Sequence, residues 1–486
     1  NLLTTYPELE FRRVRRSRRE KAVWVVLYVR NERIFNPDVA HEVTLRADGN
    51  SNFIVRSKCT NVIHALWLHS EVGMTLVILT EKADLRITRD ENILGTHRNE
   101  FDQSSRHLLI NDIKILAHSI HMVVFQALTW EARDVEGEHQ ISIFGKTEDG
   151  KSVCVTTTFD PYFFVKLPRG TTDQDVSRLY NDICRLKRDH VTSYSLTKQK
   201  DVWGFQNNEE FHFMHLNFKS LEHRRKVNSI FMYNNEFKQY HVYESNIDPV
   251  LRLMHRTGIQ STGWLDTGDT CVRSHLAKTD IDLWCNDWST LKPVERDDIA
   301  PFIVASFDIE CNSSTGKFPD PNVPDDACFQ IAVSLCKFGS DEPYEKVCLC
   351  YKKTDGPDVI SFDTEKEMLL AFKKYMNEKD IDILTGWNIF GFDLEYIYKR
   401  AAMVGCGIDF YQLGKLKDTE CHLVMKKLSS SALGDNFLKL LPMSGRFVFD
   451  MFHEVKKGYK LDSYSLNNVS KLYLGDQKID MAPKEM

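Results

Sequence analysis

Residues 301–310 read PFIVASFDIE, and this stretch decides how the second half of the chain folds. It is an apolar run that ends on two acids, Asp308 and Glu310, which one residue separates. Such a run predicts a buried strand, and side chains two residues apart on a strand share one face. Both carboxylates are therefore expected to project together from the end of this strand.

The elements that follow predict a mixed α/β sheet. Further strands are expected at 329–338, 346–351, 381–385 and 446–449, and helices at 364–377, 393–404 and 463–474. Three strands, a helix, a strand and a helix is the order of a ribonuclease-H-like sheet, although periodicity alone leaves other α/β sheets open.

The region before residue 301 is richer in strands. Strands are expected at 123–130, 141–144 and 153–158, with Asp149-Gly150 as a hairpin turn, and a helix at 173–186. These elements predict an α+β region over 122–300. Residues 1–121 have no sustained periodicity and contain six arginines between Arg12 and Arg19, a run that is either a phosphate-binding or nuclear-localisation-like tract or a solvated, disordered extension.

Composition excludes several classes of protein. A chain of 486 residues predicts two to four domains. The longest clean apolar run, 22–29, is far shorter than the roughly 20 residues of a membrane span. The net charge of −6 means that any nucleic-acid contact is a local patch. Twelve cysteines without a CxxC pair argue for reduced thiols inside a cell rather than a zinc ribbon or disulfide framework.

A third acid, Asp393, bears on whether Asp308 and Glu310 bind a metal ion. Two carboxylates held close together repel each other unless a hard divalent cation bridges them, but an isolated D-x-E is usually a strand that runs into an acidic turn. Asp393 opens the helix after the strand at 381–385, where it suits either helix capping or metal binding, and both roles can hold together. For Asp450, at the end of the last strand, we expect a structural role.

Five blocks of sequence match a known family in collinear order. SFDIEC (306–311) and LTGWNIFGFDLEYIYKR (384–400) resemble the first and second exonuclease motifs of family-B DNA polymerases. The segments 141–168, 240–265 and 445–480 resemble the flanking regions of the delta-type catalytic subunits. The resemblance runs from about Met122 to Met486.

The resemblance implies a proofreading 3′→5′ exonuclease domain of ribonuclease-H-like fold at 301–486, behind the polymerase's amino-terminal domain at 122–300. Asp308, Glu310 and Asp393 would be ligands of two divalent cations, Mg²⁺ or Mn²⁺. Asn388 and Phe392 would position the frayed single-stranded 3′ end of DNA.

Two parts of the family pattern are missing. The third exonuclease motif, Y-x-x-x-D, is expected beyond Met486, because Tyr459 is followed at that spacing by Ser463. The polymerase centre is absent too: LDTGDTC (265–271) has Cys271 where an aspartate is required. We therefore expect an incomplete exonuclease domain, with one sheet face uncovered, and a chain that is nearly inactive alone.

The leading interpretation is part of a replicative, delta-like DNA polymerase from a eukaryote or a large DNA virus. It would act on primer-template DNA in the nucleus or a viral replication compartment, with accessory subunits or a sliding clamp bound through other regions, and not at a membrane. The alternatives are a free-standing exonuclease with the same carboxylates and a nucleic-acid-binding module with an inactive nuclease site. Residues 1–121 match no family and would be a spurious extension if Met122 is the true start.

Overall fold

The computed structural model describes residues 122–187, 190–430 and 434–476, together with four short strands between residues 44 and 79. The chain divides into two compact units, Asn1–Ser119 and Ile120–Met486. In the first unit, β1 (Thr44–Ala47) pairs antiparallel with β2 (Phe53–Arg56), and β3 (His64–Ser70) with β4 (Gly73–Leu79). The arginine run at 12–19 lies outside the described residues, so its role stays a prediction.

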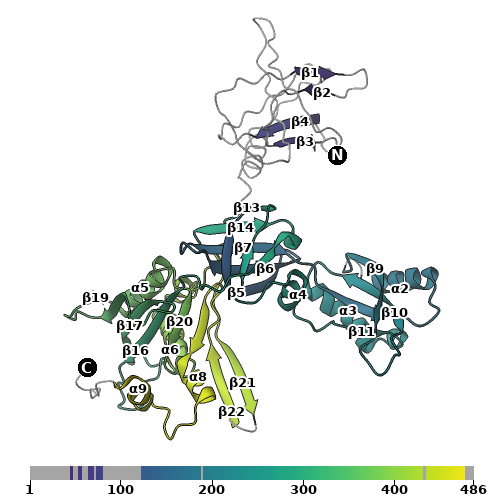
Figure 1. Ribbon diagram of the computed structural model, residues 1–486. Helices are drawn as coiled ribbons and strands as arrows, with labels where there is room; N and C mark the ends of the chain where they lie inside the picture. The colour runs from purple at the N-terminus through teal and green to yellow at the C-terminus, as the bar shows by residue number, and fades with distance from the viewer. Residues whose placement is uncertain are drawn as a thin grey trace, which may run out of the picture. The chain divides into compact units, whose positions relative to one another are not determined.

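The second unit begins with a seven-stranded sheet (Figure 1). Its order is β13-β14-β7-β6-β5-β12-β15, from β5 (Val124–Val135), β6 (Glu138–Lys146), β7 (Ser152–Thr158), β12 (Trp264–Asp266), β13 (Cys271–Arg273), β14 (Ile281–Cys285) and β15 (Lys292–Val294). The hairpin turn predicted at Asp149-Gly150 is confirmed between β6 and β7, since Gly150 takes φ +84°, a value that glycine adopts without strain. The short one-turn helix η2 spans Trp288–Thr290.

A four-stranded sheet with two helices is inserted into this region. The chain runs through β8 (Tyr162–Lys166), α2 (Asp173–Leu186), β9 (Ser193–Lys200), β10 (Glu210–Asn217), α3 (Leu221–Tyr233), η1 (Asn235–Phe237) and β11 (His241–Tyr243). The sheet order β11-β8-β10-β9 is a split βαβ arrangement. Thr172 and Asp175 form a capping box that starts α2 where the sequence predicts it. The helix α4 (Pro249–Thr257) leads back to the larger sheet.

The rest of the unit is a six-stranded mixed sheet of order β19-β18-β17-β16-β20-β23. The strands of the sheet are β16 (Ile303–Cys311), β17 (Cys328–Lys337), β18 (Glu345–Tyr351), β19 (Val359–Phe362), β20 (Ile383–Gly386) and β23 (Phe447–Asp450). The helices of this region are α5 (Glu365–Glu378), α6 (Asp393–Met403), α7 (Gly407–Phe410), α8 (Met451–Gly458) and α9 (Leu466–Leu474). The strands β16, β20 and β23 run parallel, while β17 is antiparallel to β16 and β18. The predicted mixed α/β sheet is thus confirmed.

The structure differs from the sequence-based elements at several points in 301–486, and it adds strands and helices in 122–300 for which no individual element is predicted. The final helix begins at Leu466 rather than at 463, because the Ser465 side chain caps it by accepting the N–H of Asn468. The strand β19 extends the sheet beyond the predicted strands. A hairpin of β21 (Val424–Ser430) and β22 (Gly434–Leu440) was also not predicted; its strands pair with each other in a separate two-stranded sheet.

The two faces of the six-stranded sheet are covered differently. One face packs on α5 and α6 through a continuous apolar core, in which the ring of Phe307 lies 5.8 Å from that of Phe372. On the other face, a cavity of about 800 Å³ separates the strands from α8 and α9. Leu472 and Leu474 of α9 are exposed at 59% and 79%. Since α8 and α9 lie over this face, the expectation of an uncovered sheet face is wrong for the described residues. None of the helices in the described ranges is long and apolar enough to cross a bilayer.

Candidate active site

The two acids of β16 lie on one face of the strand. Their neighbours Phe307 and Ile309 point into the apolar core and are almost fully buried, whereas Asp308 is exposed and Glu310 is half-buried. The strand alternation therefore places Asp308 and Glu310 on the face away from α5 and α6, as the sequence predicts. Asp308 also lines the cavity on this face.

Asp393 reaches the same strand from the start of α6. Its carboxylate, only 3% exposed, accepts the backbone N–H of Ile309. Burial, followed by the negative charges of Asp308 and Asp450, raises the pKa of Asp393 to about 7, although hydrogen bonds from backbone N–H groups partly oppose this rise. Asp393 thus lies within electrostatic reach of Asp308. It is the first helical residue rather than the N-cap, which is Phe392.

The loop between β20 and α6 carries the other predicted residues. Asn388 is exposed and takes φ +61°, and Gly391 packs so tightly on the Asn388 side chain that a Cβ atom there would lie 2.4 Å from its Oδ1. The ring of Phe392 lies 5.1 Å from the exposed ring of Phe318 and 5.0 Å from that of Tyr396. The loop therefore holds a polar amide and one aromatic ring beside Asp393, and Phe318 adds a second ring from the segment between β16 and β17.

Asp450 fixes this loop from the end of β23. Its buried carboxylate accepts the N–H groups of Asn388 at 2.8 Å and Phe390 at 2.9 Å. It also caps α8 by accepting the N–H of Phe452 at 3.0 Å. Three backbone hydrogen bonds to one carboxylate give Asp450 the structural role that we expect from the sequence.

The described residues contain no group of three or more His, Cys, Asp or Glu side chains arranged to hold a metal ion. Asp308 and Asp393 act on each other electrostatically, but Asp308, Glu310 and Asp393 do not form a complete ligand cluster. Their carboxylate oxygens are the donors that Mg²⁺ and Mn²⁺ prefer, so the donor chemistry suits a divalent cation. The predicted set of three metal ligands stays a prediction.

One contributor to the site was not singled out from the sequence. Trp387 lines the same cavity as Asp308, and its ring lies 5.9 Å from that of Phe452 in α8. Trp387 could have been found from the sequence because it directly precedes Asn388, which is predicted to contact DNA. Tyr459, set aside as a substitute for the missing tyrosine, also lines the cavity.

Part of the chain, including the predicted site residues, matches a known family model. Residues 240–469 match the model of the DNA polymerase family B exonuclease domain. The chain is 33% identical over 375 residues to a DNA polymerase of Paramecium bursaria Chlorella virus NY2A, which covers 74% of this chain and 40% of that protein. It is 31% identical over 373 residues to the DNA polymerase delta catalytic subunit of Dictyostelium discoideum, covering 70% and 33%. The chain thus spans less than half the length of these relatives.

A solved structure shares the fold. The family B DNA polymerase of the hyperthermophilic archaeon Pyrobaculum calidifontis aligns with a TM-score of 0.50 at 20% identity, over 72% of this chain and 39% of that chain. At this identity the likeness shows the fold alone, and it agrees with the predicted strand-rich α/β architecture.

Proposed function

We propose that residues 301–486 serve to remove nucleotides from the 3′ end of single-stranded DNA, because residues 240–469 match the model of the DNA polymerase family B exonuclease domain. Residues 122–300 would be the polymerase's amino-terminal domain. The observation that carries the proposal is the position of the Asp393 carboxylate against the strand of Asp308 and Glu310. A buried acid beside another acid at the end of a sheet is the environment expected of a catalytic carboxylate.

The carboxylates of Asp308, Glu310 and Asp393 would hold two divalent cations, Mg²⁺ or Mn²⁺. When bound, such ions lower the pKa of an attacking water and stabilise the charge on the leaving oxygen. Water would then replace the 3′ oxygen at the terminal phosphorus, which releases a 5′-nucleotide and leaves a new 3′ hydroxyl. Asp393 has the raised pKa of a carboxylate in an acidic, buried place, so cation binding would favour its ionised form.

Asn388 and Phe392 would orient the DNA end. The exposed amide of Asn388 offers donors and an acceptor to the sugar-phosphate backbone. The rings of Phe392 and Phe318 offer faces on which a base or sugar packs, and aromatic stacking tolerates every base. This tolerance suits an editing site, which must remove any nucleotide.

The relatives support a proposal about the wider role. We infer a delta-like replicative polymerase as the setting, acting on primer-template DNA in the nucleus or a viral replication compartment, with accessory subunits or a sliding clamp as partners of other regions. The alternatives remain a free-standing exonuclease and a binding module with an inactive nuclease site. The split βαβ insertion and the seven-stranded sheet favour the polymerase setting, because trimming a DNA end does not require them.

The test replaces Asp308 and Glu310 together by Ala in a polymerase that carries this chain. We expect 3′ trimming of single-stranded DNA to fall by more than about 10²-fold while primer extension continues. The matched control is Asp341→Ala, an exposed acid in the turn between β17 and β18. Retained trimming in the double variant would assign the chemistry to another site, and absence of primer extension in the parent would favour the free-standing or binding-module alternatives.

A further inference from the structure

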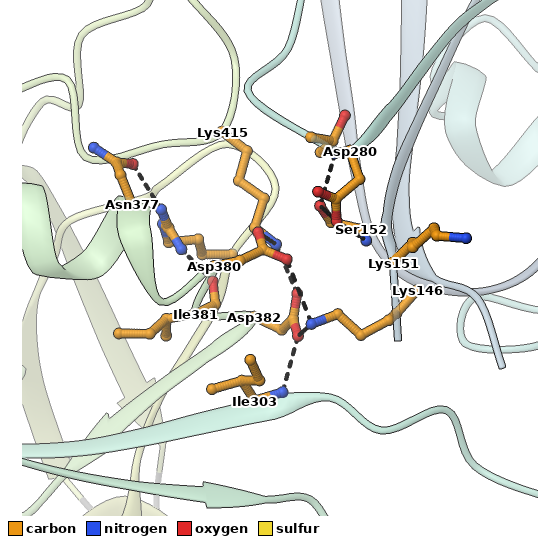
Figure 2. A network of polar contacts seen from close by, with 12 residues as sticks. Lys146, Lys151, Ser152, Asp280, Ile303, Asn377, Asp380, Ile381, Asp382 and Lys415 are labelled. Carbon is orange, nitrogen blue, oxygen red and sulfur yellow. Dashed lines mark hydrogen bonds and ion pairs between the residues drawn. The ribbon is translucent and has the colours of Figure 1, made fainter. Parts of the chain in front are cut away.

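A buried cluster of charges joins the seven-stranded sheet to the six-stranded sheet. Lys146, at the end of β6 and only 1% exposed, lies 2.6 Å from Asp382 and 3.4 Å from Asp380. Lys415 contacts the same two carboxylates at 2.6 and 2.8 Å. Figure 2 shows the two aspartates between these lysines. We call Lys146, Asp380, Asp382 and Lys415 the basal ion cluster.

The charges of this cluster are strongly coupled. Burial raises the pKa of Asp380, but Lys415 and Lys146 outweigh it and hold that pKa below its ordinary value. The aspartate therefore stays ionised inside the protein. Without Lys146, Asp380 and Asp382 would share Lys415, and a buried carboxylate that loses a partner is an uncompensated charge that destabilises its surroundings.

The basal ion cluster sits where three strands begin. The Asp382 carboxylate accepts the N–H of Ile303 at 2.9 Å, at the start of β16, and the Asp382 carbonyl accepts the N–H of Phe447 at 2.8 Å, at the start of β23. Asp382 itself directly precedes β20. Arg446 completes the junction by donating to the carbonyls of Ile381 and Leu413. One aspartate thus links the starts of β16, β20 and β23.

The opposite ends of these three strands carry the candidate active site. Asp308 lies about 17 Å along β16 from the cluster, at roughly 3.3 Å per residue. The strand β20 leads into the loop of Asn388, and β23 ends on Asp450, which binds that loop. Past the last pairing of β16 with β20, the Ile309 N–H bonds the Asp393 carboxylate instead. A shift in strand register at the base would therefore move the acids relative to one another.

We infer that Lys146 is a positioning residue for the exonuclease site: by holding Asp382, it lets the amino-terminal sheet set the spacing of Asp308, Glu310 and Asp393. The inference rests on the proposed function of those acids. It makes the amino-terminal domain a part of the exonuclease's framework. A salt bridge that only joins two domains would contribute to stability and leave the acids unchanged.

The experiment compares Lys146→Met with Lys146→Arg, which keeps the charge. The control is Lys151→Met, an exposed lysine in the turn between β6 and β7 that pairs with exposed Asp149. Mn²⁺ binding by the purified chain is measured by electron paramagnetic resonance. The unaltered chain is first compared with Asp308→Ala/Glu310→Ala; equal Mn²⁺ binding by these two would refute the proposed function itself.

If that comparison shows binding at the acids, we expect Lys146→Met to weaken it by about tenfold, the lower end of the range for residues that orient metal ligands. Lys146→Arg and Lys151→Met should bind as the parent does. Hydrogen exchange gives a second readout: the amides of Ile309, Asn388 and Phe390 should exchange faster in Lys146→Met, while those of α2 stay unchanged.

Two results would overturn the inference. One is a lower melting temperature of Lys146→Met with Mn²⁺ affinity and amide exchange within twofold of the parent, which would make the cluster a mere domain contact. Where Lys146→Met does not fold, Lys146→Met/Asp382→Asn replaces it, because this pair leaves no unpaired charge at either position. Parental Mn²⁺ affinity in that folded variant is the second overturning result.

Discussion

Replacing Asp393 by Asn should stabilise the metal-free protein. The pKa of Asp393 rises from 3.8 to about 7, mainly because the carboxylate is buried and secondly because Asp308 lies near it. A rise of this size corresponds to about 4 kcal/mol lost from folding once the group is ionised in both states. Asn removes the buried charge and keeps an oxygen for the N–H of Ile309, but a neutral acceptor bonds more weakly. We therefore expect the free energy of unfolding of the variant to rise by about 2 kcal/mol, which is half of the cost of burying the charge.

The stability difference between the parent and the Asn variant should depend on pH. Because the folded pKa is raised, the parent loses stability from this group as pH rises from 3.8 to 7, and the loss is complete above 7. Thermal melts in EDTA should show the Asn variant about 4–8 °C above the parent at pH 8, with a smaller gain at pH 5. Mg²⁺ at pH 8 should then raise the melting temperature of the parent more than that of the variant. Asp341→Asn is the control.

A variant that melts below the parent at pH 8 would refute this reasoning. So would a gain that is equal at both pH values, because it would mean that Asp393 does not titrate between them. Either result would show that the carboxylate stabilises the loop more than its burial costs.

Three further predictions follow from other parts of the chain. Arg400→Met should destabilise the fold by about 3–5 kcal/mol in denaturant titrations, because it leaves the buried Glu365 carboxylate without its two-pronged partner; an effect below 1 kcal/mol would refute this. A chain that starts at Met122 should melt within a few degrees of the whole, since 1–119 and 120–486 are separate compact units; a larger fall would mean that the first unit packs on the second. The chain alone should bind single-stranded DNA weakly and cut it about 10²–10⁴-fold more slowly than a form that adds the third motif, and robust Mg²⁺-dependent degradation would contradict this.

The local parts of the site could be predicted from the sequence. The alternation around Asp308 gives its face directly, because an apolar neighbour on each side must point into the core. Asp393 follows from a buried strand, a short loop and an amphipathic helix. In each case the signal lies within about ten residues, where strand and helix periods are readable.

The long-range parts could not be predicted. The hairpin β21–β22 pairs with itself, and its polar strands give no core-facing pattern to detect. The order of the split βαβ sheet depends on which strands pair across the chain. Lys146 and Asp382 look like ordinary surface charges in the sequence, since nothing local marks a lysine that is 1% exposed.

The position of the basal ion cluster explains why the site depends on long-range contacts as well as on local sequence patterns. Asp308 and Glu310 lie near the carboxyl end of β16, and Asp393 lies against the same strand from the start of α6. By the inference above, their spacing would be set in part at the amino ends of the strands, which are buried against the seven-stranded sheet. A buried charge pair is a costly way to join two sheets, yet it has one preferred geometry, which an apolar contact lacks. In this protein the geometry of the acids, which local sequence patterns predict, would depend on the other end of the strands. There the ammonium group of Lys146, from the seven-stranded sheet, is held by Asp382.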